Sequence, residues 1–333
     1  MNKKALITGI TGQDGCYLAK LLLSKGYKVF GAQRRNTGKR YWRLEELGIT
    51  DHIEFVDIDL GEPYNIEKVI DNVKPDEFYN LAAQSFVGLS FEQPQVTTIT
   101  NSLGVLNILE VLRNKHQNIK FYQASTSEMY GKVTETPQNE TTRFYPRSPY
   151  GCAKAYSHYL TVNYRESYNL FACSGILFNH ESPMRGEEFV TRKTTKGLVE
   201  WTKTGKPLEL GNLESFRDWG HAEDYVEAMW LMLQQDQPED YVISTGKTIQ
   251  IKDFIKKCLN ELNIKYEFKG HEVFDEKGNQ IIKTNPKFFR PAEVDLLIGD
   301  NSKAKQKLLW KPKHTIDTLV KDMIEADLKR FKN

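Results

Sequence analysis

Two side chains four residues apart, Tyr150 and Lys154, could together move a proton and support a hydride transfer. Both fall in a segment that we expect to be helical from Pro149 to about Asn169, so they share one face of that helix. A nearby ammonium favours the phenolate of a tyrosine and lowers its pKa from the usual value of about 10. A phenolate can accept a hydroxyl proton while hydride leaves the same carbon for a nicotinamide. Because this spacing often arises by chance, the pair carries weight only beside other motifs.

A hydroxyl and a carboxylate follow a predicted strand in the stretch Ser125-Thr126-Ser127-Glu128. If the chain is extended there, Thr126 and Glu128 point to the same side. A carboxylate beside a transient ketone can remove the proton from the neighbouring carbon, which elimination of water requires. The alternative is a surface glutamate that caps the following turn. The stretch favours elimination over plain oxidation.

A glycine-rich loop, Gly9-x-x-Gly12-x-x-Gly15, lies between a predicted strand and a predicted helix near the N-terminus. Glycines allow a tight turn and a close backbone approach to a pyrophosphate, which binds at the helix N-terminus. An ordinary strand-to-helix turn is the alternative, but this context favours a dinucleotide. We expect Thr11, Gln13 and Asp14 in the same loop to contact the cofactor.

The end of the second predicted strand bears on which cofactor binds. An acidic residue there would favour NAD, but the sequence reads Gln33-Arg34-Arg35-Asn36. Arg34 and Arg35 are suited to clamp a 2′-phosphate, although arginine pairs are also common in solvated loops. We therefore predict NADP. Further cofactor contacts are expected at the ends of the third and fourth strands, from Asp59, Leu60, Leu81, Ala82, Ala83, Gln84 and Ser85.

The elements that must position these residues alternate between strands and helices, which predicts a parallel sheet. Strands are expected at 4–8, 28–32, 53–57, 77–81, 120–125 and 171–177, and a long helix at about 95–113. We predict an α/β fold with a Rossmann-type doubly wound parallel sheet and a smaller mixed α/β C-terminal lobe. Residues 1–178 would form the NADP-binding domain, interleaved with a mainly substrate-binding lobe at 179–333. Residues 269–283 are expected to form an exposed hairpin.

Bulk composition excludes several classes of function. Lys and Arg number 46 against 44 Asp and Glu, so net charge gives no argument for a nucleic-acid or membrane partner. No apolar run approaches the roughly 20 residues of a membrane span. The four cysteines form no CxxC pair, so we predict neither a metal site nor disulfides, and a cytoplasmic location.

The motifs together resemble those of the GDP-mannose 4,6-dehydratase family, within the extended short-chain dehydrogenase/reductase superfamily. The resemblance covers nearly the whole chain and rests on residues 9–15, 79–85, 121–128, 144–150, 175–183, 189–193, 217–219 and 289–294. It implies a hydro-lyase that oxidises carbon 4 of a GDP-sugar, removes water across carbons 5 and 6, and returns the same hydride to carbon 6. The product implied from GDP-mannose is a GDP-4-keto-6-deoxy sugar. A homo-oligomer, tetramer or dimer, is also implied.

The resemblance assigns roles residue by residue. Thr126 would bind the carbon-4 oxygen, Glu128 would be base and then acid, Tyr150 the phenolate base, and Lys154 its electrostatic support and a ribose ligand. His180 and Arg185 match positions associated with the cofactor. Positions associated with the GDP-sugar are Ser85, Ser127, Asn179, Val190, Lys193, Gly211, Arg217, Arg290 and Glu293.

Three other functions remain open from the sequence. The same chemistry could act on GDP-D-glycero-D-manno-heptose if the pocket is roomier beside Ser85, Phe86, Ser127 or Cys152. A reductase or epimerase would not need Glu128. An NADP-sensing protein would need none of the acid–base groups.

Overall fold

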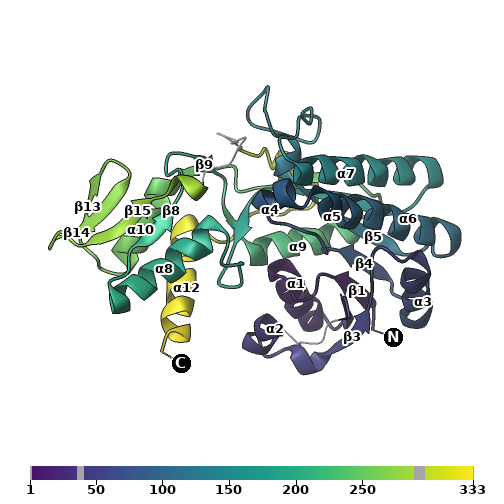
Figure 1. The fold of residues 1–333 in the computed structure, drawn as a ribbon. Helices are drawn as coiled ribbons and strands as arrows, with labels where there is room; N and C mark the ends of the chain where they lie inside the picture. Colours follow the sequence, from purple (N-terminus) through teal and green to yellow (C-terminus); the bar gives the residue numbers. More distant parts are fainter. Residues whose placement is uncertain (1, 36–40, 289–296, 333) are drawn as a thin grey trace.

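The computed structural model describes residues 2–35, 41–288 and 297–332. Within them, seven parallel strands form one sheet in the order β11-β6-β5-β4-β1-β2-β3 (Figure 1). The strands are β1 (Lys4–Thr8), β2 (Lys28–Gln33), β3 (Ile53–Asp57), β4 (Glu77–Asn80), β5 (Lys120–Thr126), β6 (Ala172–Leu177) and β11 (Tyr241–Ile243). The predicted Rossmann-type doubly wound sheet is therefore confirmed.

The sheet is buried on both faces because helices cover each side. On one face, α1 (Gln13–Ser24) packs beside α9 (Ala222–Leu233) over an apolar core that includes Ile7 and Tyr79. On the other face, α3 (Pro63–Val73), α6 (Gly104–Lys115) and α7 (Pro149–Tyr168) pack on Leu6 and Phe78. Strands buried on both faces read as continuous apolar runs, which is why they stand out in the sequence.

The long helix predicted at about 95–113 is interrupted. It is made of α5 (Pro94–Thr98), a π-helical segment (Ile99–Leu103) and α6. Two shorter helices, α2 (Trp42–Glu46) and α4 (Val87–Glu92), were not predicted. A π-helical turn inside a helix often marks a functional region, and here it lies beside the loop that follows β4.

The C-terminal lobe has a second sheet, in the order β13-β14-β15-β8. Its strands are β13 (Tyr266–Lys269), β14 (Glu272–Asp275), β15 (Gln280–Thr284) and β8 (Leu208–Leu210). Strands β14 and β15 form the predicted hairpin, and its turn at residues 276–279 is exposed as predicted, but Val273, Ile281 and Ile282 are fully buried. Their side chains join a core with α8 (Val190–Thr204), α10 (Ile251–Glu261) and α12 (Ile316–Arg330).

A two-stranded parallel sheet of β7 (His180–Glu181) and β10 (Gly220–His221) lies between the two lobes. A second short pair, β9 (Phe216–Arg217) with β12 (Ile249–Gln250), borders the C-terminal lobe. Strand β11, helix α9 and helix α11 (Ser302–Lys307) come from beyond residue 178, yet they pack with the large sheet. None of the helices in the described residues is long and apolar enough to cross a membrane.

Candidate active site

A cavity of about 700 Å³ opens at the carboxyl ends of β4, β5 and β6, between the large sheet and the C-terminal lobe. Residues from both lobes that the sequence selected for chemistry or binding line it. They are Asp14, Leu81, Ala83, Ser85, Thr126, Glu128, Tyr150, Lys154, Asn179, His180, Arg185, Val190, Lys193, Gly211 and Arg217. The structure thus brings the predicted catalytic set and much of the predicted substrate set to one place.

The other predicted site residues do not line this cavity. They are Gly9, Thr11, Gly12, Gln13, Gly15, Arg34, Arg35, Asp59, Leu60, Ala82, Gln84 and Ser127. Arg34 and Arg35 are exposed just after β2. Ser127 was expected beside the sugar, but it is 1% exposed, and its hydroxyl is turned into the protein. Arg290 and Glu293 lie outside the described residues.

Thr126 and Glu128 reach the cavity by a geometry that differs from the prediction. The extended chain ends at Thr126, and Ser127–Met129 form a single 3₁₀ turn. The Thr126 hydroxyl caps this turn by accepting a hydrogen bond of 3.2 Å from the Glu128 backbone N–H. The turn, and not an extended strand, turns both side chains to the same side.

Tyr150 is held in its neutral form, contrary to the predicted phenolate. Burial raises its pKa to about 12; a hydrogen bond with Thr126 opposes this rise and the negative charge of Glu128 adds to it. The expected lowering by Lys154 is absent, because the Lys154 ammonium lies 5.9 Å from the centre of the Tyr150 ring and donates to the Ala124 carbonyl oxygen at 2.9 Å. Burial also lowers the pKa of Lys154 to about 8.

The glycine loop has the tight geometry that the motif predicts. Gly9 has a positive φ of 70°, and a β-carbon at Gly15 would lie 2.3 Å from the Gly9 carbonyl oxygen. Gly12 precedes α1 in an extended conformation without a side-chain cap. The N-terminus of α1 therefore presents backbone N–H groups toward a close-fitting loop, which suits a pyrophosphate.

Two arginines, Arg43 and Arg330, stabilise this loop through hydrogen bonds that involve α2. Arg43 of α2 donates to the Thr11 carbonyl oxygen at 3.0 Å and to the Met184 carbonyl oxygen at 2.6 Å. Arg330 of α12 donates to both carboxylate oxygens of Glu46, also in α2, at 2.9 and 2.8 Å. The loop is thus tied to both lobes through α2.

A partly buried ion pair joins the loop to β7. The Nε2 atom of His180 lies 2.8 Å from the Asp14 carboxylate, and its Nδ1 atom lies 2.8 Å from the Phe178 carbonyl oxygen. Because both partners only accept hydrogen bonds, both ring nitrogens carry protons and His180 is an imidazolium. Burial opposes ionisation of both groups, but their mutual attraction outweighs it, raising the pKa of His180 and lowering that of Asp14.

Several residues that position the site were not predicted from the sequence. Asn101, in the π-helical segment, exchanges two hydrogen bonds of 2.9 Å with the backbone of Gln84. Ser182 donates to the Gln13 amide oxygen at 2.7 Å. These residues have no motif of their own, because their role depends on segments that only the fold brings together.

Aromatic and cationic side chains line the half of the cavity nearest the C-terminal lobe. Phe86 and Phe189 meet edge to face with ring centres 5.9 Å apart, and the Arg185 guanidinium lies 3.5 Å from the Phe189 ring centre. The Lys193 ammonium lies 3.3 Å from the Phe288 ring centre. Cations beside apolar rings suit a ligand with both phosphates and a planar base.

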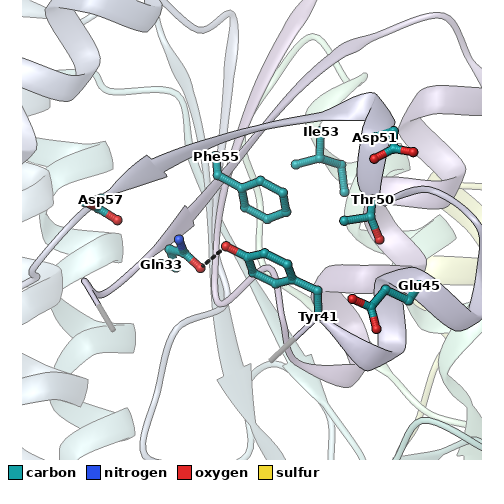
Figure 2. Close-up of a pocket in the computed structure, with 8 residues that line it drawn as sticks. All are labelled: Gln33, Tyr41, Glu45, Thr50, Asp51, Ile53, Phe55 and Asp57. Carbon is teal, nitrogen blue, oxygen red and sulfur yellow. Dashed lines mark hydrogen bonds between the residues drawn. The ribbon is translucent and has the colours of Figure 1, made fainter. Parts of the chain in front are cut away.

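A second cavity, of about 650 Å³, lies outside the catalytic region, along β3 and α2 (Figure 2). Tyr41 stacks on Phe55 with ring centres 4.4 Å apart and donates to the Gln33 amide oxygen at 3.0 Å. No residue predicted for catalysis or binding lines this cavity. It is therefore not a candidate for the chemistry.

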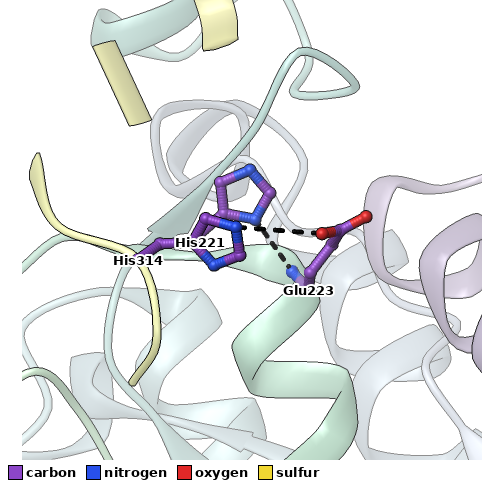
Figure 3. Close-up of side chains that lie close together, drawn as sticks. All are labelled: His221, Glu223 and His314. Atoms are coloured by element: carbon purple, nitrogen blue, oxygen red, sulfur yellow. Dashed lines mark hydrogen bonds and ion pairs between the residues drawn. The ribbon is translucent and has the colours of Figure 1, made fainter. Parts of the chain in front are cut away.

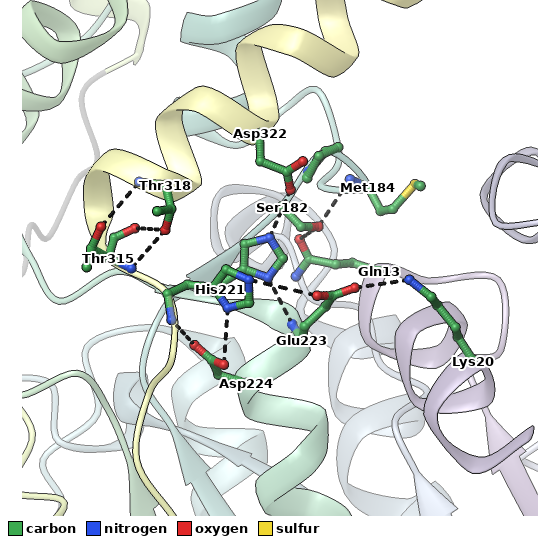
Figure 4. Close-up of polar contacts among 12 residues, drawn as sticks. Gln13, Lys20, Ser182, Met184, His221, Glu223, Asp224, Thr315, Thr318 and Asp322 are labelled. Atoms are coloured by element: carbon green, nitrogen blue, oxygen red, sulfur yellow. Dashed lines mark hydrogen bonds and ion pairs between the residues drawn. The ribbon is translucent and has the colours of Figure 1, made fainter. Parts of the chain in front are cut away.

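A third polar region joins α9 to the start of α12, away from both cavities. His221 and His314 stack with ring centres 4.1 Å apart, beside Glu223 (Figure 3). His221 Nδ1 accepts from the Glu223 backbone N–H at 3.1 Å, so its Nε2 donates to Asp322 at 3.0 Å (Figure 4). Since both nitrogens of His221 already have partners, a metal ion could bind this residue only after one of these bonds had broken.

Known proteins resemble this chain along its whole length. A solved UDP-glucose 4-epimerase from Thermotoga maritima has a TM-score of 0.84 and 24% identity, covering 98% of this chain and 99% of that chain, which shows a shared fold. A GDP-mannose 4,6-dehydratase from Vibrio cholerae is 49% identical over 99% of this chain and 95% of its own length. One from Drosophila melanogaster is 50% identical over 98% and 86%. The model of the family described as GDP-mannose 4,6 dehydratase matches residues 6–323. The chain belongs to the GDP-mannose 4,6-dehydratase family.

Proposed function

We propose that this protein is a hydro-lyase that converts GDP-mannose to GDP-4-keto-6-deoxy-mannose with a resident NADP. The observation that carries the proposal is the shared cavity of Thr126, Glu128, Tyr150 and Lys154, which also has Lys193 and Arg217 in its lining. A reductase would need the hydroxyls and the lysine. The carboxylate of Glu128 adds the base that elimination requires.

Each residue has a role that follows from its place in the site. Thr126 and Tyr150, already hydrogen-bonded to each other, would hold the carbon-4 oxygen of the sugar between them. Tyr150 would take the proton of that hydroxyl, and Glu128 would remove the carbon-5 proton and protonate the leaving carbon-6 hydroxyl. NADP, when bound, would supply the hydride acceptor and then the hydride donor.

Because Tyr150 is neutral in the protein alone, it can act as a base only after its pKa has been lowered. Because burial holds the pKa of its phenol at about 12 in the protein alone, proton removal needs additional positive charge near the ring. Lys154 would supply part of it by giving up its bond to Ala124 and turning toward the ligand. The positive charge on the oxidised nicotinamide ring would supply the rest.

The fit of a dinucleotide rests on this chain's own geometry. A β-carbon at Gly9 or Gly15 would clash with neighbouring backbone atoms, so both glycines are needed for the tight turn before α1, and the start of α1 has N–H groups without a side-chain cap. Arg34 and Arg35 supply exposed positive charge just beyond β2, which suits the additional phosphate of NADP. Two solved structures with the same fold are a dTDP-glucose 4,6-dehydratase in complex with NAD and a protein complexed with NADPH.

The decisive experiment follows mass and isotope together. The purified protein is incubated with GDP-mannose, and in parallel with the heptose analogue, and loss of one water is followed by mass spectrometry. Deuterium placed on carbon 4 should reappear on carbon 6 without added cofactor. A net build-up of NADPH, or no loss of water, would contradict the proposal.

Glu128→Gln separates elimination from oxidation. The amide cannot accept the carbon-5 proton, so we expect loss of water to fall by about 10²- to 10⁴-fold. Glu135→Gln is the matched control, because Glu135 is an exposed residue that does not line the cavity. An unchanged rate in Glu128→Gln would favour a reductase or epimerase.

We also infer a homo-oligomer that buries an apolar face of α5, the π-helical segment and α7 against a second copy of the chain. Large apolar side chains are exposed along these neighbouring helices, namely Val96, Ile99, Leu103, Tyr156 and Tyr159. Patches of this kind mark interaction sites. Sedimentation of Tyr159→Glu, which introduces charge into the patch, should show a smaller species than the unchanged protein.

All four cysteines are free thiols, which is consistent with the predicted cytoplasmic location.

A further inference from the structure

Three successive residues at the end of β5 interact with three residues on one stripe of α7. The Ala124 carbonyl oxygen accepts from Lys154 at 2.9 Å, the Ser125 hydroxyl lies 3.2 Å from His158 Nδ1, and Thr126 lowers the pKa of Tyr150, beside which it lines the cavity. The helical partners are spaced by four residues, so they project from one side of α7. The proposed reaction uses Thr126, Tyr150 and Lys154, and it leaves Ser125 and His158 without a role.

His158 is a buried titratable side chain on α7, one helical turn after Lys154. It is 5% exposed, and it packs edge to face against Phe144 with ring centres 5.1 Å apart. Tyr159 lies beside it on α7, at 5.8 Å. The charged groups that act on it are Arg165 and Asp240, which form a two-bond pair with each other at 2.9 and 2.7 Å. Burial lowers the pKa of His158 below its ordinary value, while the charges of Asp240 and Arg165 act on it in opposite directions.

The protonation state of His158 controls what Ser125 can do. In the neutral ring, Nδ1 can accept the hydroxyl hydrogen of Ser125, whereas in the charged ring Nδ1 must donate. A charged ring would therefore turn the Ser125 hydrogen away from His158 and place an uncompensated charge beneath the end of β5. Ser125 also lines the cavity, one residue before Thr126.

We propose that His158 is a positioning residue for the dehydration, holding the end of β5 against α7 through Ser125 so that the Thr126 and Tyr150 hydroxyls meet at one substrate oxygen. The inference rests on the proposed function. It predicts that His158 acts on the rate of the chemical step while leaving substrate binding nearly unchanged, because the groups placed around the GDP portion are on the opposite wall.

A pair of variants separates positioning from mere packing. His158→Leu fills the space but removes the bond, and we expect kcat to fall by roughly tenfold to a hundredfold, with KM for GDP-mannose within about twofold. His158→Asn places an amide near the Nδ1 position and should recover most of kcat. Ser125→Ala should lose as much as His158→Leu, and the double variant no more, since both remove one bond. Equal kcat in His158→Leu and the unchanged protein would overturn the proposal, as would failure of His158→Asn to recover activity.

The pH profile provides a readout that a packing role would not move. The neutral ring is the competent form, so kcat should fall as the pH drops below about 6.5 and through the lowered pKa of His158. In His158→Asn nothing titrates at this position, and the ratio of its kcat to that of the unchanged protein should rise as the pH falls from 7 to 5. A constant ratio would count against the inference. Thermal unfolding at each pH keeps loss of fold separate from loss of rate.

Hydrogen exchange tests the contact without any substrate. In His158→Leu, peptides covering residues 120–126 should exchange faster than in the unchanged protein, while peptides of α12 should be unaffected. If the unchanged protein fails to dehydrate GDP-mannose, the proposed function fails, and the exchange measurement still decides whether His158 holds β5. Unaltered exchange at 120–126 would overturn the inference on its own.

Discussion

Two histidines of the β7–β10 sheet contact different helices, and their ring nitrogens have different kinds of hydrogen-bond partner. His180 reaches Asp14 of α1, at the cofactor loop, and both of its nitrogens donate. His221 reaches Asp322 of α12, but its second nitrogen accepts, so a neutral ring is sufficient. The first contact is a partly buried ion pair and the second a hydrogen bond to a half-exposed carboxylate. Fixed charge is thus concentrated at the site where a charged ligand would bind.

The largest effect should come from breaking the charged contact. In Asp14→Asn the His180 imidazolium loses its counter-ion while remaining partly buried, so we expect the free energy of unfolding to fall by about 3 kcal/mol. Urea unfolding at pH 7 measures this loss. Asp322→Asn is the matched change at the other histidine and should lose much less. Equal losses would remove the distinction between the two contacts.

The pH dependence of stability should come next in size. The pKa of His180 is raised by Asp14, so its contribution is complete below the unfolded pKa of about 6.5 and is lost as the pH rises through the folded value. The pKa of Asp14 is lowered, so its contribution is lost only in acid. Urea midpoints between pH 6 and 9 should fall for the unchanged protein more steeply than for His180→Gln. If the urea midpoints of the two proteins changed with pH in parallel, His180 would not be an imidazolium in the folded protein.

A smaller effect is expected at the second histidine. His221→Gln keeps a donor and an acceptor but not the ring that stacks on His314, so the free energy of unfolding should fall by about 1 kcal/mol. Urea unfolding at pH 7 measures this loss. A loss as large as that of Asp14→Asn would contradict the difference between the two histidines.

The smallest effect should be at the solvent-exposed edge of the same region. Lys20 of α1 pairs with Glu223 at 3.2 Å, and both side chains are more than a third exposed. Lys20→Ala should change the free energy of unfolding by less than about 0.5 kcal/mol, and by less still in 0.5 M salt, in which such pairs are screened. A larger change in calorimetry would show that α1 depends on this pair.

The sequence was sufficient for the elements that repeat a strong local pattern. The first six strands and the glycine loop were predicted, since buried parallel strands and strand-to-helix turns have signals within a few residues. Strand β11 was missed because three residues carry no periodicity, and its place depends on pairing with β6. The burial of residues 273 and 281–282 was missed for a similar reason: it depends on β15 pairing with β8, about seventy positions earlier.

The candidate site divides in the same way. Thr126, Glu128, Tyr150 and Lys154 were predicted by type and spacing, and they line one cavity. The predicted lowering of the Tyr150 pKa is not found in the protein alone, in which burial raises this pKa to about 12. The sequence indicates that Lys154 and Tyr150 share a helix face, but not that Lys154 donates a hydrogen bond to the Ala124 carbonyl oxygen. His158 and Asn101 had no signal, because each acts on a segment far away in the chain.

The hydrogen bonds of Arg43 and Arg330 that stabilise the glycine loop bear on the order in which the protein folds during synthesis. Glu46 and Arg330 are 284 positions apart, and their pair closes the path from α12 through α2 and Arg43 to Thr11. A ribosome releases most of the parallel sheet long before it reaches Arg330. A nascent chain stopped before Arg330 would therefore have most of its parallel sheet but would lack the Arg330–Glu46 pair that supports the glycine loop. We expect its affinity for the dinucleotide to be lower than that of the full chain.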